Sequence, residues 1–151
     1  MPGLYLEDFQ VGQVFRHPLT KSVTESDNML FSVMTLNPQP LHIDFAFAAK
    51  TEWGKPLVNS LFTLGLMIGI SVHGTTLGTI VANLGMTETG FPHPVFHGDT
   101  LRVETEVRSV RESKSKPDRG VVEMEHRAYN QHGNLVARCV RQTMVQKRPA
   151  A

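Results

Sequence analysis

Residues 35–72 decide the fold, and they read TLNPQPLHIDFAFAAKTEWGKPLVNSLFTLGLMIGISV. From Leu57 to Val72 nearly every residue is apolar or small, without the alternation that is typical of a strand. This pattern predicts a helix that is buried on most of its sides. A polar loop with two prolines precedes it. The loop is expected near the N-terminal end of the helix, where free backbone N–H groups attract negative charge.

The sequence after this helix consists mainly of strand-like runs. Residues 79–89 are expected to form a strand, and residues 100–111 alternate between apolar and charged side chains. Two more strands are expected at 121–130 and 135–146, joined by a turn with the sequence QHGN. We therefore predict an α+β fold in which a curled antiparallel sheet wraps around one long central helix.

The sequence before residue 35 predicts an edge strand and one helix. Residues 15–23 have strand-like composition, but Pro18 interrupts them, which favours the edge of a sheet. Thr24 and Asp27 have the spacing of a capping box, so a helix should follow and end near Leu36.

Two apolar patterns within the predicted helices concern packing. Leu30, Val33 and Met34 fall on one face of the first helix. Gly65 and Gly69 lie four residues apart in the central helix, where each costs about 1 kcal/mol relative to alanine. We expect close packing against these glycines to explain them.

Length, charge and cysteine content exclude several classes of protein. The 151 residues predict one domain, 1–151, that is long enough to bury a core. The formal net charge of +1 gives no argument for a nucleic-acid or membrane partner. Cys139 is the lone cysteine, which excludes an intrachain disulfide and a clustered thiolate zinc site. The central run is also short of a membrane span. We expect a cytoplasmic protein.

Motifs spread over almost the whole chain carry a resemblance to a known family. They are EDFQVGQ (7–13), TESD (24–27), PLHID (40–44), EWGKPLV (52–58) and PVFHGDTL (94–101). Together they resemble the MaoC-like hydratases of the hot-dog fold, which include the (R)-specific enoyl-CoA hydratases. The resemblance implies a lyase that adds water reversibly to the double bond of an enoyl-CoA thioester. It implies no cofactor besides the coenzyme A of the substrate, and a homodimer or higher homo-oligomer.

The chain departs from the family pattern at several positions. The family pattern is Asp, any residue, Asn, Pro, an aliphatic residue, His, any residue, Asp. His42 matches the family histidine, whereas Asn37 stands in place of the catalytic Asp and Gln39 in place of the Asn. Asn59 and Ser60 replace a His-Gly pair. The combination of QPLH with PLVNS is similar to the mesaconyl-CoA or itaconyl-CoA hydratase branch. A short branched or carboxylated acyl group is therefore expected.

These positions are the candidate site residues. His42 is expected to be catalytic, because an imidazole can exchange a proton near neutral pH. Asn37 cannot act as a general base, but its amide could hold a water molecule; a role in ending the first helix is an equal alternative. Backbone N–H groups at Asn59 and Ser60 would bind the thioester oxygen. Gln39 is a further candidate for substrate binding.

Two other functions stay open at this point. A hot-dog acyl-CoA thioesterase would share the oxyanion site at the helix end, but it normally needs a carboxylate nearby, and residues 54–70 contain none. A non-catalytic acyl-CoA or acyl-carrier binding module would account for the missing Asp at position 37.

Three further polar residues are assigned structural roles. Asp44 is expected to cap a short helix. His93 and His97 flank Pro94 in an extended segment, so they lack the helical spacing of a two-histidine metal site, and no metal is expected. His97 is expected to lie in a solvent-exposed turn, although it could approach the site.

Overall fold

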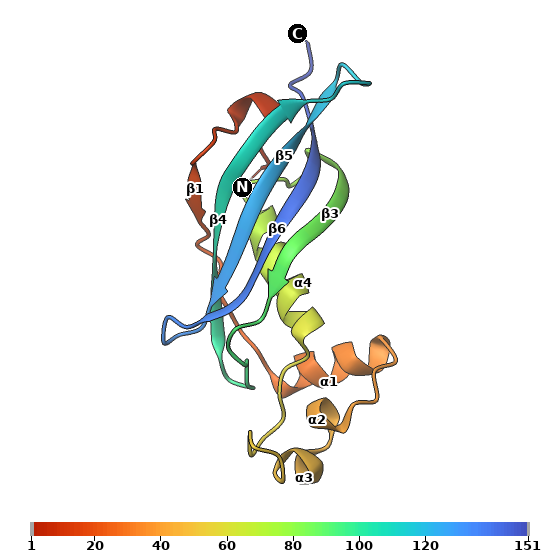
Figure 1. Cartoon of the computed structure of the whole chain (residues 1–151), viewed down its shortest axis with the longest axis vertical. Coiled ribbons are helices and arrows are strands. Elements are labelled where there is room, and N and C mark those ends of the chain that lie inside the picture. Colours follow the sequence, from red (N-terminus) through yellow and green to blue (C-terminus); the bar gives the residue numbers. More distant parts are fainter. Residues whose placement is uncertain (1, 151) are drawn as a thin grey trace.

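The computed structural model describes residues 2–150 and consists of a curled antiparallel sheet packed against one long helix (Figure 1). The strands are β1 (Val14–Arg16), β2 (Lys21–Ser22), β3 (Ile80–Gly90), β4 (Thr100–Glu112), β5 (Arg119–Tyr129) and β6 (Leu135–Gln146). The helices are η1 (Leu6–Asp8), α1 (Glu25–Met34), α2 (Pro40–Ile43), α3 (Phe45–Ala48) and α4 (Ser60–Val72). The predicted α+β fold is confirmed.

The strands follow the order β1-β4-β5-β6-β3, and β2 also pairs with β4. All of these pairs are antiparallel. The predicted edge position of the interrupted first strand is confirmed, since Pro18 separates β1 from β2. The hairpin between β5 and β6 turns at Gly133, whose positive φ of 80° suits glycine because it has no Cβ.

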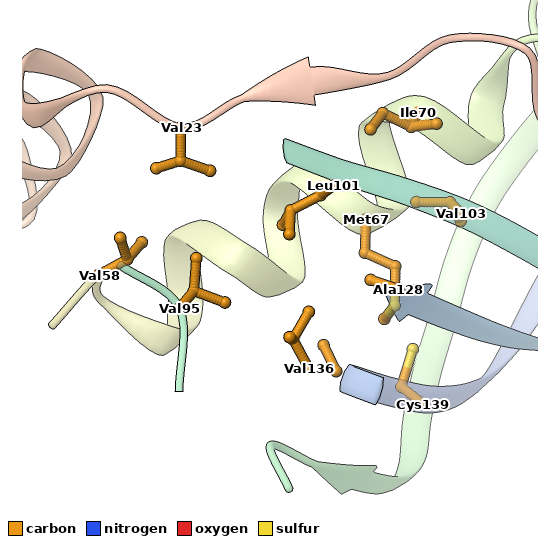
Figure 2. Packing of buried hydrophobic residues seen from close by; sticks show 11 residues of the cluster. Val23, Val58, Met67, Ile70, Val95, Leu101, Val103, Ala128, Val136 and Cys139 are labelled. Carbon is orange, nitrogen blue, oxygen red and sulfur yellow. The ribbon is translucent and has the colours of Figure 1, made fainter. Parts of the chain in front are cut away.

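The core lies between the concave face of the sheet and α4. Met67 and Ile70 of α4 pack with Val103, Ala128 and Cys139 of the sheet (Figure 2). Fully burying a side chain such as Met67 contributes about 1.5–3 kcal/mol. The alternation predicted for β4 is confirmed, because its apolar side chains are buried, Leu101 and Val103 in this core, and its charged ones line the opposite face.

A second apolar cluster covers the other end of the sheet. Leu6 and Phe9, at and just after η1, pack with Val122 and Met124 of β5. Gly120 permits this approach, because a Cβ at that position would collide with the side chain of Leu6. The N-terminal segment is thus part of the core.

Helix α4 begins at Ser60, three residues later than the predicted start at Leu57. Leu57 forms an isolated antiparallel bridge with Phe96, and the N–H of Val58 donates to the carbonyl of Val95 at 2.9 Å. These backbone bonds hold residues 57 and 58 extended alongside the loop before β4. No helix within residues 2–150 is long and apolar enough to cross a membrane.

Most residues of α4 are buried or half-buried, as expected, but one stripe of the helix is exposed. The sheet covers one side of the helix (Figure 1). Leu61, Gly65 and Gly69 are exposed and, at a spacing of four residues, lie along one face of the helix. A Cβ at either glycine would meet nothing within 4 Å, so close packing within this chain does not explain them. The exposed stripe of Leu61, Gly65 and Gly69 carries no polar side chain.

Helix α1 begins as predicted but turns an unexpected face inward. The capping box is confirmed: the Thr24 hydroxyl accepts the N–H of Asp27, and the Asp27 carboxylate accepts the N–H of Thr24. The apolar stripe of Leu30, Val33 and Met34 is 60%, 62% and 72% exposed. The buried side chains of α1 are instead polar, Asn28 and Ser32.

Candidate active site

The polar loop that contains the predicted site residues is built on the C-terminal end of α1. Leu36 takes a positive φ of 55°, and the next residue, Asn37, donates its N–H to the carbonyl of Ser32 at 2.8 Å. This is the hydrogen bond that commonly closes a helix C-terminus. Asn37 therefore has a backbone role in ending α1, and its side chain stays partly exposed.

Hydrogen bonds connect Asn37 to His42 through Gln39. The side-chain oxygen of Asn37 accepts the N–H of Gln39 at 3.1 Å, and the carbonyl of Gln39 accepts the N–H of His42 at 3.0 Å. Pro40 occupies the first position of α2, where its fixed φ suits the start of a helix. The structure thus brings these three predicted residues into one turn.

The imidazole of His42 is held in one orientation. Its Nδ1 lies 2.8 Å from the carbonyl oxygen of Leu57, and the ring is partly buried. Because a carbonyl can only accept, Nδ1 must carry the hydrogen, and Nε2 of the neutral ring is left as an acceptor. His42 can therefore take up a proton at a fixed position.

Asn59 caps the start of α4. Its side-chain oxygen accepts the N–H of Leu61 at 3.0 Å, and its own N–H donates to the side-chain oxygen of Asn28 at 2.9 Å. Its side-chain nitrogen donates to the Ser32 hydroxyl at 3.4 Å, so its backbone N–H and both ends of its amide are engaged, and the side chain is buried. Ser60 is the first residue of α4, where the backbone N–H has no acceptor within the helix. Of the predicted pair, Ser60 is the better placed to bind an oxyanion.

A cavity of about 230 Å³ lies beside this helix start. It is lined by Trp53, Leu57, Val58, Ser60, Thr63, Val136 and the segment from Phe91 to Val95. Leu57 thus lines the cavity and also orients the His42 ring with its carbonyl. The cavity therefore lies next to the first residue of α4 and next to the residue whose carbonyl orients the His42 ring.

Asn28 is a residue of this site that the sequence did not single out. Its side chain contacts four polar groups, the carbonyls of His42 and Leu57, the N–H of Asn59, and Nε2 of His97. The only signal in the sequence is the spacing of Asn28 and Ser32, a polar pair four residues apart on one face of α1.

The expectation of a solvent-exposed His97 is wrong. The residue is partly buried, and its ring lies against Phe45 with 6.1 Å between ring centroids. Burial lowers the pKa of His97, and the carboxylate of Glu25 opposes this effect. A neutral His97 agrees with the 3.0 Å contact in which its Nε2 accepts from the Asn28 amide.

Asp44 is the N-cap of α3, as predicted, since its side chain accepts the N–H of Phe47 at 3.0 Å. Within residues 2–150 the structure contains no cluster of three or more His, Cys, Asp and Glu side chains that could hold a metal ion.

Comparison with known proteins places the chain in a family. Residues 8–130 match the model of the MaoC-like domain, so the chain belongs to the MaoC-like dehydratase family. A mesaconyl-CoA hydratase from Cereibacter sphaeroides is 33% identical over 149 residues, which cover 99% of this chain and 43% of that protein. The chain therefore spans less than half the length of that relative.

Two further similarities support the fold and the family. An (R)-specific enoyl-CoA hydratase from Aeromonas caviae is 32% identical over 112 residues, covering 72% of this chain and 78% of that protein. The double hot-dog protein Rv0216 from Mycobacterium tuberculosis superposes with a TM-score of 0.88 at 25% identity, covering 99% of this chain and 46% of the other. The fold is the hot-dog fold.

Proposed function

We propose that this chain is a hydro-lyase that adds water reversibly to the double bond of an enoyl-CoA thioester. The observation that carries the proposal is the contact between Nδ1 of His42 and the Leu57 carbonyl, which leaves Nε2 as a proton acceptor. Leu57 lies three residues before α4 begins, so this acceptor and the helix N-terminus belong to the same part of the fold. The family membership and the hydratase relatives support the same activity.

The reaction follows from these two groups. Nε2 of His42 removes a proton from water while the water oxygen bonds to the β-carbon of the enoyl group. The electrons of the double bond move toward the thioester oxygen, and the N–H of Ser60 stabilises the charge that develops there. The protonated His42 then returns its proton to the α-carbon. The product is a 3-hydroxyacyl-CoA, and the reverse sequence is the dehydration.

Asn37 would bind the attacking water, and Gln39 would bind the acyl group. The amide nitrogen of Asn37 can donate to the attacking water, and its oxygen keeps a second lone pair beside the one that Gln39 occupies. Gln39 is exposed at the start of α2, from which its side chain can reach an acyl group. In this arrangement His42 alone transfers the protons.

The acyl group is proposed to be short and either branched or carboxylated, as in mesaconyl-CoA or itaconyl-CoA. A carboxylate at position 37 would repel a carboxylated acyl group. At a separation of about 5 Å and an effective dielectric constant near 20, that repulsion is roughly 3 kcal/mol. An asparagine removes the repulsion and still offers hydrogen bonds to water. The similarity to a mesaconyl-CoA hydratase points in the same direction.

One panel of acyl-CoA thioesters separates the three candidate functions. A hydratase removes the enoyl absorbance and releases no thiol, whereas a thioesterase releases free coenzyme A. A binding module would bind the thioesters without changing either signal. Release of free thiol at a rate above that of hydration would overturn the proposal.

A homodimer or higher homo-oligomer is part of the proposal. The sheet order ends at β3, where Ile80, Val81 and Leu84 are exposed, and the apolar stripe of α4 is exposed as well. An unpaired edge strand is a template for pairing with another chain, and pairing two β3 strands would bury both surfaces. We further propose that residues 1–151 act as one domain, and that the protein is cytoplasmic.

A further inference from the structure

Asn28 contacts three segments that are far apart in the sequence. Its side chain is 0% exposed. The amide nitrogen lies 2.9 Å from the carbonyl of Leu57, 3.2 Å from the carbonyl of His42 and 3.0 Å from Nε2 of His97. The amide oxygen accepts the N–H of Asn59 at 2.9 Å. One side chain thus connects α1 to α2, to the start of α4 and to the loop before β4.

The partners determine which atom of the amide is which. Carbonyls of Leu57 and His42 can only accept, and the N–H of Asn59 can only donate. If the amide were turned the other way, its oxygen would face two carbonyl oxygens and its nitrogen would face an N–H group. Buried polar groups without a partner are costly. The amide nitrogen carries two hydrogens for three neighbouring acceptors, so one hydrogen is shared, and the 3.2 Å contact with the His42 carbonyl is the longest of the three. Because this nitrogen only donates, Nε2 of the neutral His97 ring accepts and the ring hydrogen lies on Nδ1.

The Leu57 carbonyl connects Asn28 to the proposed chemistry. It accepts both the Nδ1–H of His42 and an N–H of the Asn28 amide. The same amide fixes the N–H of Asn59, the residue directly before the proposed oxyanion donor Ser60. Asn28 therefore bonds both to the carbonyl that orients the His42 ring and to the residue directly before the oxyanion donor.

We propose that Asn28 is the positioning residue of this site: it sets the orientation of the His42 ring relative to the first N–H of α4, and it holds His97 in its Nδ1–H form. This inference rests on the proposed hydratase function for its kinetic consequences. Which ring nitrogen of His42 and of His97 carries the hydrogen follows from the hydrogen bonds alone and does not depend on any activity.

Asn28→Asp is the informative substitution, because it keeps the size and one acceptor oxygen but loses the donor. The carboxylate can still accept the N–H of Asn59. Its second oxygen would face the Leu57 carbonyl, another acceptor, so the support of the His42 ring is lost. Nε2 of His97 can then pair with Asp only as a donor, either after the ring hydrogen moves from Nδ1 to Nε2 or after the ring gains a proton. The added negative charge favours the protonated ring, so the pKa of His97 should rise.

Asn130→Asp is the matched control. Asn130 is also a buried asparagine, and its side-chain oxygen accepts two backbone N–H groups, those of His132 and Asn134, in the turn between β5 and β6. A carboxylate can accept both bonds, so this variant places a charge at a buried asparagine whose side-chain bonds stay within the turn.

The experiment measures kcat and KM for an enoyl-CoA and the ¹⁵N chemical shifts of the histidine rings in the wild type and both variants. Asn28→Asp should lower kcat by about a hundredfold, as expected for a loss of positioning, with KM changed less than about threefold. It should also raise the pKa of His97. Asn130→Asp should change neither. Wild-type kcat in a folded Asn28→Asp variant would overturn the inference.

The ring spectra of the wild type keep the inference testable if Asn28→Asp does not fold. They should show His42 and His97 both as the Nδ1–H form. An Nε2–H form of His97 would overturn the inference. If the wild type hydrates no enoyl-CoA, the proposed function fails, while the ring spectra still decide whether Asn28 holds the two histidines.

Discussion

Nδ1 of His42 lies 2.8 Å from the carbonyl oxygen of Leu57. This hydrogen bond joins a residue of α2 to the extended segment that leads into α4, and it fixes which ring nitrogen is free to move a proton. The proposed chemistry of the site depends on this relationship.

Asn37→Asp should shift substrate preference. The wild type is expected to prefer a carboxylated, short, branched enoyl-CoA over crotonyl-CoA, and the variant should move toward crotonyl-CoA, because a second carboxylate would repel the charged acyl group. The repulsion of roughly 3 kcal/mol corresponds to about a hundredfold in binding. The measurement is the ratio of kcat/KM for the two substrates in both proteins. A wild type that favours crotonyl-CoA, or a ratio that does not move, would separate Asn37 from substrate charge.

Leu84→Lys should weaken the proposed dimer. Leu84 is 50% exposed on β3, the last strand of the sheet order, where a lysine is a typical device against pairing with another chain. Light scattering at micromolar concentration should give a dimer for the wild type and a monomer for the variant. Val11→Lys, at an exposed position before β1, is the control and should stay dimeric. A fully active wild-type monomer would rule the dimer out.

The protein should lose stability as the pH falls through the ordinary histidine range. His126 is fully buried between Thr105 and Arg141, and burial in the first place, with the positive charge of Arg141, lowers its pKa well below 6.5. The unfolded chain therefore binds a proton that the folded chain excludes. As far as His126 is concerned, the free energy of unfolding has its full value above about pH 6.5. Below that pH it falls by about 1.4 kcal/mol per pH unit.

Urea unfolding at pH 7.5 and 5.5 checks this prediction. The wild type should lose about 1.4 kcal/mol more than His126→Gln between these two values, because glutamine can donate and accept hydrogen bonds but does not titrate. The prediction is wrong if both proteins lose stability equally over this interval.

Much of the fold follows from local patterns in the sequence. The capping box at Thr24 predicts the start of α1, and the alternation from Leu101 to Val107 predicts the buried face of β4. These signals depend only on neighbouring residues. Periodicity divides a helix into faces, however, and does not say which face turns inward. The apolar stripe at Leu30 and Val33 is exposed for this reason, while the polar side chain of Asn28 is buried.

The candidate site was predictable only in part. His42 is identified by its motif, because a family pattern fixes a residue type at one position. Asn28 and His97 join the site through contacts over 14 to 69 residues of sequence, which no local pattern records. Gly65 and Gly69 show a related limit, because their spacing suggests close packing while a Cβ at either would meet nothing within 4 Å.

The rate of enoyl-CoA hydration by the wild type and by His42→Ala tests the central claim most directly. Turnover should fall by about 10²- to 10⁴-fold in His42→Ala with little change in KM, because a positioned acid/base acts mainly on the transition state. His132→Ala, at an exposed turn position, is the control and should keep the wild-type rate. A loss of less than about tenfold in His42→Ala would contradict the account, since His42 would then have no part in proton transfer.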